Sequence, residues 1–131
     1  MSEQKTNLPP TNVDAEELFK TDKARGITLS LLENGAFSYY AWFGGVRNMD
    51  WQAGHLEVMY DDDEGDRAKF KRLEFGDLLS AAEKLRDGTV KINRTIRHGV
   101  SDALVGDFGH WDIDAMDAVV QVAVFGEVVY G

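Results

Sequence analysis

The C-terminal quarter of the chain, residues 98–131, restricts the possible folds more than any other stretch. It contains no lysine or arginine: its first part carries five aspartates, and its last part is the nearly uncharged run VVQVAVFGEVVYG. The apolar part has to be buried, because exposing so many branched side chains to water is unfavourable. The acidic part has to face solvent, a cation or a partner. We therefore expect a core element that begins in a polar segment.

This apolar run can form either a helix or a strand. Asp112 or Asp114 can cap a helix, and the apolar residues that follow recur with helical spacing. Six valines between positions 119 and 129 instead favour a strand, because branched side chains suit a pleated surface. The capping pattern favours the helix, which we expect to continue to about Phe125 and to end at Gly126.

The chain of 131 residues is long enough for one domain with its own core. Residues 1–13 are polar and contain two adjacent prolines, so we expect a flexible N-terminal tail. Residues 14–131 are predicted to form a single α+β domain. Its first element is a short surface helix from Ala15 to about Lys23, with Gly26 ending that segment.

The pair Asn34-Gly35 lies between two segments rich in apolar residues. Asn-Gly tolerates the positive φ angles that both central positions of a type I′ turn require. Residues 27–33 and 36–43 are therefore predicted to form a two-residue β-hairpin. Both faces of this hairpin carry aromatic or branched side chains, so either both faces are covered or one presents an aromatic patch to a partner.

Further strands are predicted downstream. Residues 44–54 are expected to form a loop, and the alternating pattern of residues 55–60 predicts a third strand. The acidic run 61–66 is typical of a solvated turn, and residues 67–75 form a possible fourth strand. The sequence thus predicts a small antiparallel sheet of three to four strands within about residues 27–72.

Helices are predicted for residues 75–86 and 93–104, where apolar residues recur every three or four positions. Gly88 follows the first helix at the position where helices commonly end, and Asn93 can cap the second. Gly99 argues against the second helix, because glycine is a poor helix former. Together with the sheet, these segments predict an α+β fold with the C-terminal helices packed on one face.

Charge and composition exclude several classes of protein. A net charge of −9 repels phosphate backbones and anionic lipids, so nucleic acid is an unlikely partner and no membrane partner is expected. Without cysteine there is no disulfide, thiolate nucleophile or cysteine-based metal site. No apolar run reaches the ~20 residues of a membrane span, and the N-terminus lacks a signal-peptide pattern. We expect a soluble, cytoplasmic protein without a cofactor.

The acidic segment contains the best candidate for a polar site. One imidazole among nearby carboxylates is what a divalent metal or a general acid–base pair would use. The aspartates are hard oxygen ligands suited to Mg²⁺, Mn²⁺ or Ca²⁺, but their spacing matches no known metal loop. Helix capping and solubility explain most of the acids without any chemistry. The candidate residues are Asp107, His110, Asp112, Asp114 and Asp117.

Basic residues and histidines provide a second set of candidates. Arg94, Arg97 and His98 share a helix face by their spacing and could bind an anionic ligand, although internal pairing is the simpler interpretation. His55, His98 and His110 fall on three separate predicted elements. A site with three histidines would therefore require the fold to bring these elements together.

Aromatic side chains are candidates for a protein interface. Tyr39, Trp42 and Trp51 are of the types that anchor interfaces, and Trp51 is expected to be exposed on a loop. Large aromatic residues are also what a small core needs, so core packing is the competing explanation.

These observations support three functions. The leading one is a small acidic protein-interaction domain of the inhibitor, immunity or adaptor type that binds a basic partner surface, because the charge is high and no catalytic motif is present. A second is a metal-dependent or acid–base enzyme that uses His110 and the neighbouring aspartates. A third is a homo-oligomeric or phage-like assembly subunit in which the valine run supplies an isologous interface.

Overall fold

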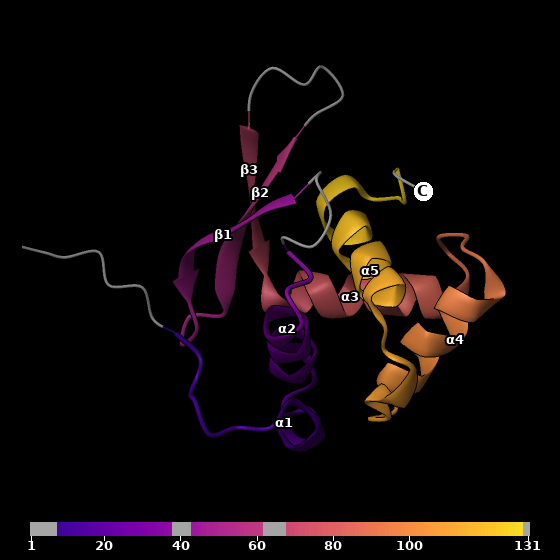
Figure 1. Ribbon diagram of the computed structural model, residues 1–131, viewed down its shortest axis with the longest axis horizontal. Helices are drawn as coiled ribbons and strands as arrows, with labels where there is room; N and C mark the ends of the chain where they lie inside the picture. The colour runs from indigo at the N-terminus through magenta and orange to yellow at the C-terminus, as the bar shows by residue number, and fades with distance from the viewer. Residues whose placement is uncertain (1–7, 38–42, 62–67, 130–131) are drawn as a thin grey trace, which may run out of the picture.

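The structure is a computed structural model that describes residues 8–37, 43–61 and 68–129. Its sheet has three strands in the order β1-β2-β3, all antiparallel, and helices cover one side of it (Figure 1). The predicted α+β class with a small antiparallel sheet is confirmed. The elements are α1 (Ala15–Thr21), α2 (Lys23–Glu33), β1 (Phe43–Asp50), β2 (His55–Asp61), β3 (Ala68–Glu74), α3 (Phe75–Asp87), α4 (Arg94–Ala103), the 3₁₀ helix η1 (Phe108–His110) and α5 (Ile113–Phe125).

The central strand β2 agrees with its prediction, and so does β3. Leu56 pairs with Leu73 of β3, and Val58 pairs with Val46 of β1. Leu56, Val58 and Leu73 are buried, so one face of the sheet belongs to the core.

The expectation of a loop at residues 44–54 is wrong for its first part, because β1 occupies Phe43–Asp50. The pairing of β1 with β2 is irregular at two places, between Phe43 and Gly45 and between Arg47 and Asp50. Such irregularities shift the side chains from one face to the other, so the strand shows no clean alternation in sequence.

The predicted hairpin is wrong as well, because residues 23–33 form the helix α2. Its first strand was inferred from the apolar residues that precede the Asn34-Gly35 turn signal. In the structure the six consecutive residues 26–31 are all buried, so the helix is enclosed on every side and shows no polar stripe. Gly26, expected to end a helix, lies inside α2.

Asn34-Gly35 ends α2 rather than forming a hairpin turn. Gly35 has a φ of +70°, and the amide of Ala36 donates to the carbonyl of Leu31, as at many helix C-termini. Positive φ is needed both by a type I′ turn and by a helix end, so the dipeptide alone does not distinguish them. The second predicted strand falls partly on residues 38–42, outside the described residues.

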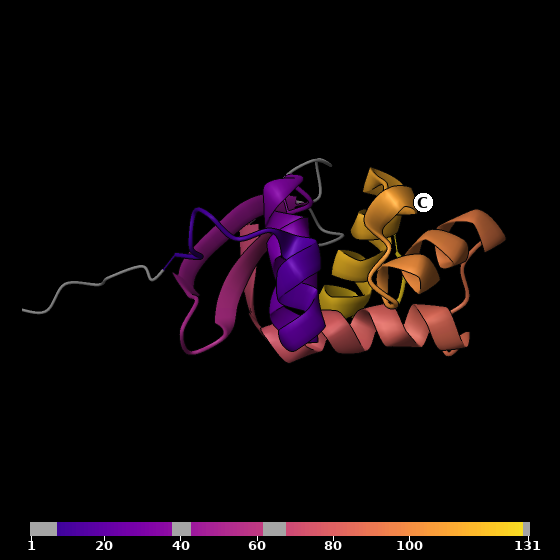
Figure 2. The same cartoon turned by 90° about the horizontal axis from the view of Figure 1, so that it is seen from below.

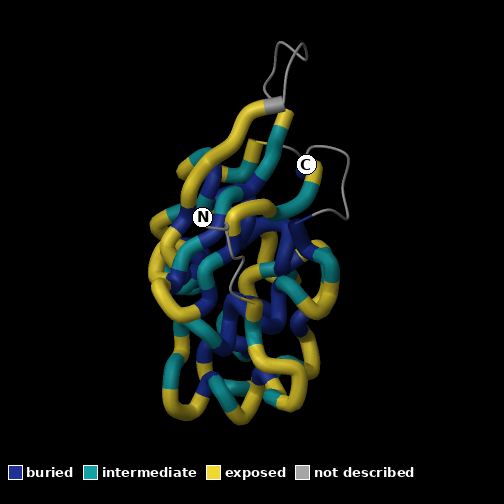
Figure 3. The backbone as a smooth tube through the Cα atoms, turned by 90° about the vertical axis from the view of Figure 1, so that its left-hand side faces the viewer, coloured by how far each residue is buried: buried dark blue, intermediate teal, exposed yellow. Residues whose placement is uncertain are grey.

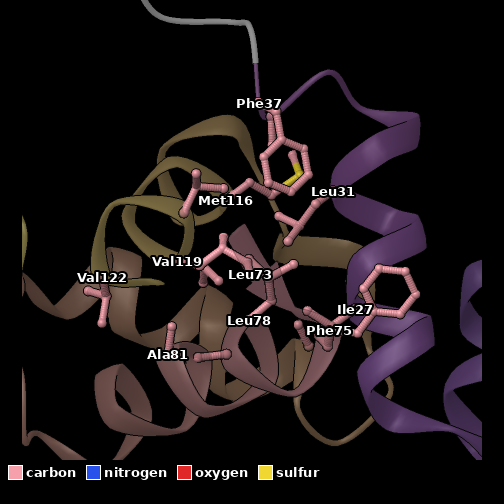
Figure 4. Packing of buried hydrophobic residues seen from close by; sticks show 14 of the residues in the cluster. Ile27, Leu31, Phe37, Leu73, Phe75, Leu78, Ala81, Met116, Val119 and Val122 are labelled. Atoms are coloured by element: carbon pink, nitrogen blue, oxygen red, sulfur yellow. The ribbon is translucent and has the colours of Figure 1, made fainter. Parts of the chain in front are cut away.

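The core lies between α2, α3, α5 and the sheet (Figure 4). Ile27 and Leu31 of α2 and Leu78 of α3 point into it, together with Val119 of α5. Because α5 is a helix whose Val119, Val120, Val122 and Val124 are buried, these four valines are packed within the chain. Val129, the last valine of the run, is 43% exposed.

The two ends of the molecule are built from different secondary-structure elements. The sheet lies at one end and α4 at the other, with α3 running between them in both views (Figures 1 and 2). Buried backbone runs through the middle, and exposed segments surround it (Figure 3). No helix within the described ranges has the length and apolar character needed to cross a membrane.

Candidate functional site

Helix α4 carries two of the polar side chains that form the candidate site. Asn93 caps this helix by accepting a hydrogen bond from the amide of Ile96 at 2.9 Å, as its sequence predicts. The helix buries Val100 and Ala103 against the rest of the protein. His98 and Asp102, one turn apart, keep exposed side-chain area of 64% and 24%.

The short 3₁₀ helix η1 carries the third side chain, His110, between two anchored aromatic residues. The indole Nε1 of Trp111 donates to Ser30 Oγ of α2 at 3.0 Å, and Trp111 is buried. The ring of Phe108 packs edge-on against Phe19 of α1, with 5.8 Å between ring centroids. These anchors on either side fix the backbone of His110, while its side chain remains 65% exposed.

Gly99 allows η1 to approach α4 closely. A Cβ atom at this position would lie 2.5 Å from the carbonyl oxygen of His110, a distance that no real side chain tolerates. Any residue larger than glycine would therefore push η1 away from the helix. The glycine that weakened the helix prediction is what brings His110 next to His98.

The three side chains meet in one cluster, which we call the His–Asp–His cluster: His98, Asp102 and His110. Asp102 Oδ2 lies 3.2 Å from His98 Nε2 and 3.0 Å from His110 Nδ1. One candidate ligand atom from each residue lies within 4.8 Å of the others. The carboxylate thus holds both imidazoles, and it either accepts hydrogen bonds from them or joins them in binding a cation.

A surface pocket of about 460 Å³ opens beside this cluster. Both histidines contribute to its wall, whereas Asp102, which contacts both imidazoles, is not among the lining residues. The volume falls within the range of about 300–1,000 Å³ that small-molecule sites occupy. The lining residues are Arg94, Thr95, His98, Gly109, His110, Trp111 and Asp112.

The predicted aspartates do not come together as a site. Asp107 accepts a hydrogen bond from the amide of Gly109 at 2.9 Å, and Asp112 accepts one from Ala115 at 2.9 Å, so each caps a helix. Asp114 lies in the first turn of α5, where negative charge suits the helix dipole.

Asp117 is buried and does not line the pocket. It accepts a hydrogen bond from Gln121 Nε2 at 2.7 Å, and Gln121 in turn accepts one from the amide of Val129 at 2.8 Å. This pair therefore connects α5 with the C-terminal tail. Of the five predicted site residues, His110 belongs to the cluster and Asp112 borders the pocket.

Of the three candidate interface residues, Trp51 lies within the described part of the chain. The expectation that Trp51 is exposed is wrong: only 8% of it is accessible, and its ring packs on Phe75 at 5.1 Å between centroids. The guanidinium of Arg25 lies over both rings and donates to the carbonyl of Trp51 at 2.9 Å. Tyr39 and Trp42 lie outside the described residues.

Sequence reasoning singled out His110 but missed Asp102, its partner. His98 and Asp102 are four residues apart on a predicted helix, a spacing that places two side chains next to each other. The sequence contains that signal. It does not reveal that η1 approaches α4, because this approach depends on the packing of Phe108 and Trp111 against α1 and α2.

Comparison with known protein families, with curated proteins and with solved structures finds no match. The chemistry of the cluster and its pocket has to be inferred from their geometry.

Proposed function

We propose that the protein binds a divalent transition-metal ion, preferentially zinc, through His98, Asp102 and His110. The bound ion would then act on a small molecule in the adjacent pocket. The observation that carries this proposal is the closeness of three ligand atoms of the right kinds beside a pocket. Without the pocket, the same three residues would suggest only a surface metal site.

The distances suit a tetrahedral ion. Ligand atoms about 2.0–2.1 Å from a tetrahedral zinc ion lie about 3.3 Å from one another. The two distances from Asp102 to the imidazole nitrogens, 3.0 and 3.2 Å, are close to this value. Because both imidazoles are largely exposed, small rotations of these side chains can adjust the remaining distance.

The ligand types favour zinc or a similar ion over magnesium. Two imidazole nitrogens and one carboxylate oxygen suit zinc, nickel, copper or iron, whereas magnesium and calcium prefer an all-oxygen set. This differs from the aspartate-rich set expected from sequence. Three protein ligands leave one coordination position for water or substrate, as catalytic zinc sites do, and a metal bound there would supply Lewis-acid activation.

Calorimetric titration of Zn²⁺ into the untagged full chain near neutral pH tests this proposal. We expect one ion per chain, and at least a tenfold loss of affinity, about 1.4 kcal/mol, in His98→Gln and in His110→Gln. Bound zinc should also raise the thermal unfolding midpoint, because the ligand stabilises only the folded state.

His55→Gln is the matched control, because His55 lies on β2 and does not line the pocket. This variant should bind zinc like the unmodified chain. Equal affinity in all three variants, or no binding up to about 1 mM zinc, would falsify the proposal; on the affinity scale, 1 mM corresponds to only about 4 kcal/mol.

A second candidate is the acidic interaction domain for a basic partner. Its supporting observation is that Asp107, Asp112 and Asp114 are all exposed around η1 and the start of α5. Their charges form a local acidic surface within a chain of net charge −9. Such a surface would speed association with a basic protein, more at low salt than at high salt.

Replacing all three aspartates by asparagine separates charge from capping, because asparagine caps helices as well as aspartate does. The folded stability should remain within about 1 kcal/mol. Binding to a basic partner recovered at low salt should weaken. Recovery of no partner at low or high salt, or of one that binds the variant equally well, would count against this function.

A further inference from the structure

We infer that the pocket beside the His–Asp–His cluster takes a small molecule with a carboxylate group, held between Arg94 and the metal. This inference rests on the proposed function, because the metal supplies one of the two attachment points. Arg94 supplies the other, and it has no part in the cluster itself.

Arg94 is placed to reach the same space as the histidines. It is the first residue of α4, and His98 follows one turn later on the same face, about 6 Å further along the axis. Arg94, His98 and His110 all line the pocket. A carboxylate lying along this wall can therefore reach the guanidinium and the open side of the cluster together.

The Arg94 side chain differs from those of the other described arginines by being unpaired. Among the six arginines of the described ranges, it alone has a side chain without a hydrogen bond or ion pair to another described residue. A guanidinium has five N–H donors in a planar fork that matches a carboxylate, so an unpaired one in a pocket wall is suited to an anionic ligand. The five paired arginines are Arg25, Arg47, Arg72, Arg86 and Arg97.

The surroundings favour a carboxylate over a more highly charged anion. The chain carries a net charge of −9, and the acidic residue Asp112 is one of those that line the pocket. Repulsion grows with the charge of the ligand, so a single negative charge is opposed least. The hydroxyl of Thr95, also in the wall, can donate a hydrogen bond to a carboxylate oxygen.

The test uses the full chain loaded with Co²⁺, whose visible absorption reports changes in its ligands. Acetate is titrated into the loaded protein, and inorganic phosphate is titrated in a parallel sample. We expect a saturable spectral change with acetate. In Arg94→Gln the acetate affinity should fall roughly 10- to 100-fold, the effect of losing one charged hydrogen-bonding group.

Lys84→Gln is the control for overall charge, because it removes the same charge from an exposed position on α3. It should leave acetate binding unchanged. Co²⁺ affinity measured without acetate should agree within about twofold in all three proteins, since Arg94 is not a ligand.

Each contrary result identifies what has failed. If the chain does not bind Co²⁺, the proposed metal function fails. If it binds Co²⁺ but acetate produces no change, or binds Arg94→Gln as tightly as the unmodified chain, the carboxylate inference alone is overturned. Tighter binding of phosphate than of acetate would also overturn it, because the pocket would then select higher charge.

Discussion

Helices α2 and α4 each contain a glycine that lets a neighbouring backbone segment approach closely, and the two approaches have different consequences. A Cβ atom at Gly26 of α2 would lie 2.5 Å from the Cα atom of Phe19, and one at Gly99 of α4 would lie 2.5 Å from the carbonyl oxygen of His110. Both glycines weaken their helices, since glycine costs about 1 kcal/mol relative to alanine in a helix interior. Both permit a neighbouring backbone to approach the helix.

The difference lies in what the neighbouring backbone carries. Phe19 is 5% exposed, so the approach of α1 to Gly26 adds an aromatic side chain to the core. His110 is exposed, so the approach of η1 to Gly99 positions a polar side chain beside a pocket. The first contact mainly stabilises the fold, whereas the second mainly builds the candidate site. The two glycines should therefore respond differently to the same substitution.

Gly26→Ala should have the largest effect on stability. The new methyl group would meet backbone atoms of Phe19, which cannot move without shifting α1, so we expect a loss of about 2–3 kcal/mol in the free energy of unfolding. Urea unfolding measures this loss. Zinc affinity of the folded fraction should change little.

Gly76→Ala is the matched control for that variant, because a Cβ atom at Gly76 of α3 would meet nothing within 4 Å. It should be neutral or stabilising by up to about 1 kcal/mol. A loss of stability equal to that of Gly26→Ala would mean that close packing on Phe19 is not the cause.

Gly99→Ala should have a smaller effect on stability and a larger one on metal binding. Only the three residues of η1, which are held at Phe108 and Trp111, have to shift, so we expect a loss of about 1 kcal/mol. The displacement of His110 from His98 should lower zinc affinity at least tenfold, about 1.4 kcal/mol. Urea unfolding and zinc titration of the same preparation measure both. Unchanged zinc affinity would show that Gly99 does not position the cluster.

The smallest effect is expected at a paired charge on the sheet. Hydrogen bonds from Arg47 and Asn48 lower the pKa of the Glu57 carboxyl below its ordinary value of 4.5. A carboxyl with a lowered pKa stabilises the folded state above its unfolded pKa, and this contribution is lost as the pH falls through the folded value. The contribution is small because the ion pair lies at the surface, with the Arg47 and Glu57 side chains 48% and 26% exposed.

Glu57→Gln should therefore be less stable than the unmodified chain at pH 7 and nearly equal to it at pH 3, by urea unfolding at both values. Equal differences at the two pH values would contradict the assignment to charge. In contrast with Arg94, Arg47 is already paired, at 2.7 Å from Glu57 Oε1. The charge of Arg47 is thus neutralised within the protein, whereas the Arg94 side chain has no partner among the described residues.

The sequence predicts the C-terminal half of the fold better than the N-terminal half. The ends of α3, α4 and α5 follow from local caps: Asn93 and Asp112 at N-termini, and Gly88 and Gly126 with φ of +81° and +82° at C-termini. These signals act within a few residues, so sequence alone contains them. The helix chosen for the valine run was correct for that reason.

The N-terminal half depends on contacts that no local pattern contains. Residues 26–31 of helix α2 are all buried by tertiary packing, so its apolar residues show no helical stripe, and the Asn34-Gly35 pair that follows them suggests a hairpin instead. Its true cap, Asp22, which accepts from the amide of Arg25 at 3.1 Å, was overlooked in favour of a helix extending through it. For β1, irregular pairing conceals the alternation.

The candidate site could be predicted in part. His110 stood out because it was the one group in the acidic segment that capping did not explain. Its sequence neighbours Asp107 and Asp112 were credible partners, yet both carboxylates cap helices instead. The actual partner, Asp102, is eight residues away and comes from α4. Only the tertiary approach at Gly99 reveals this pairing.

The hydrogen bond between Trp111 and Ser30 also affects the order of folding. It joins residues 81 positions apart, so α2 cannot complete its packing until the C-terminal segment has been synthesised. A nascent chain on the ribosome would therefore expose the apolar sides of α2 for most of its synthesis.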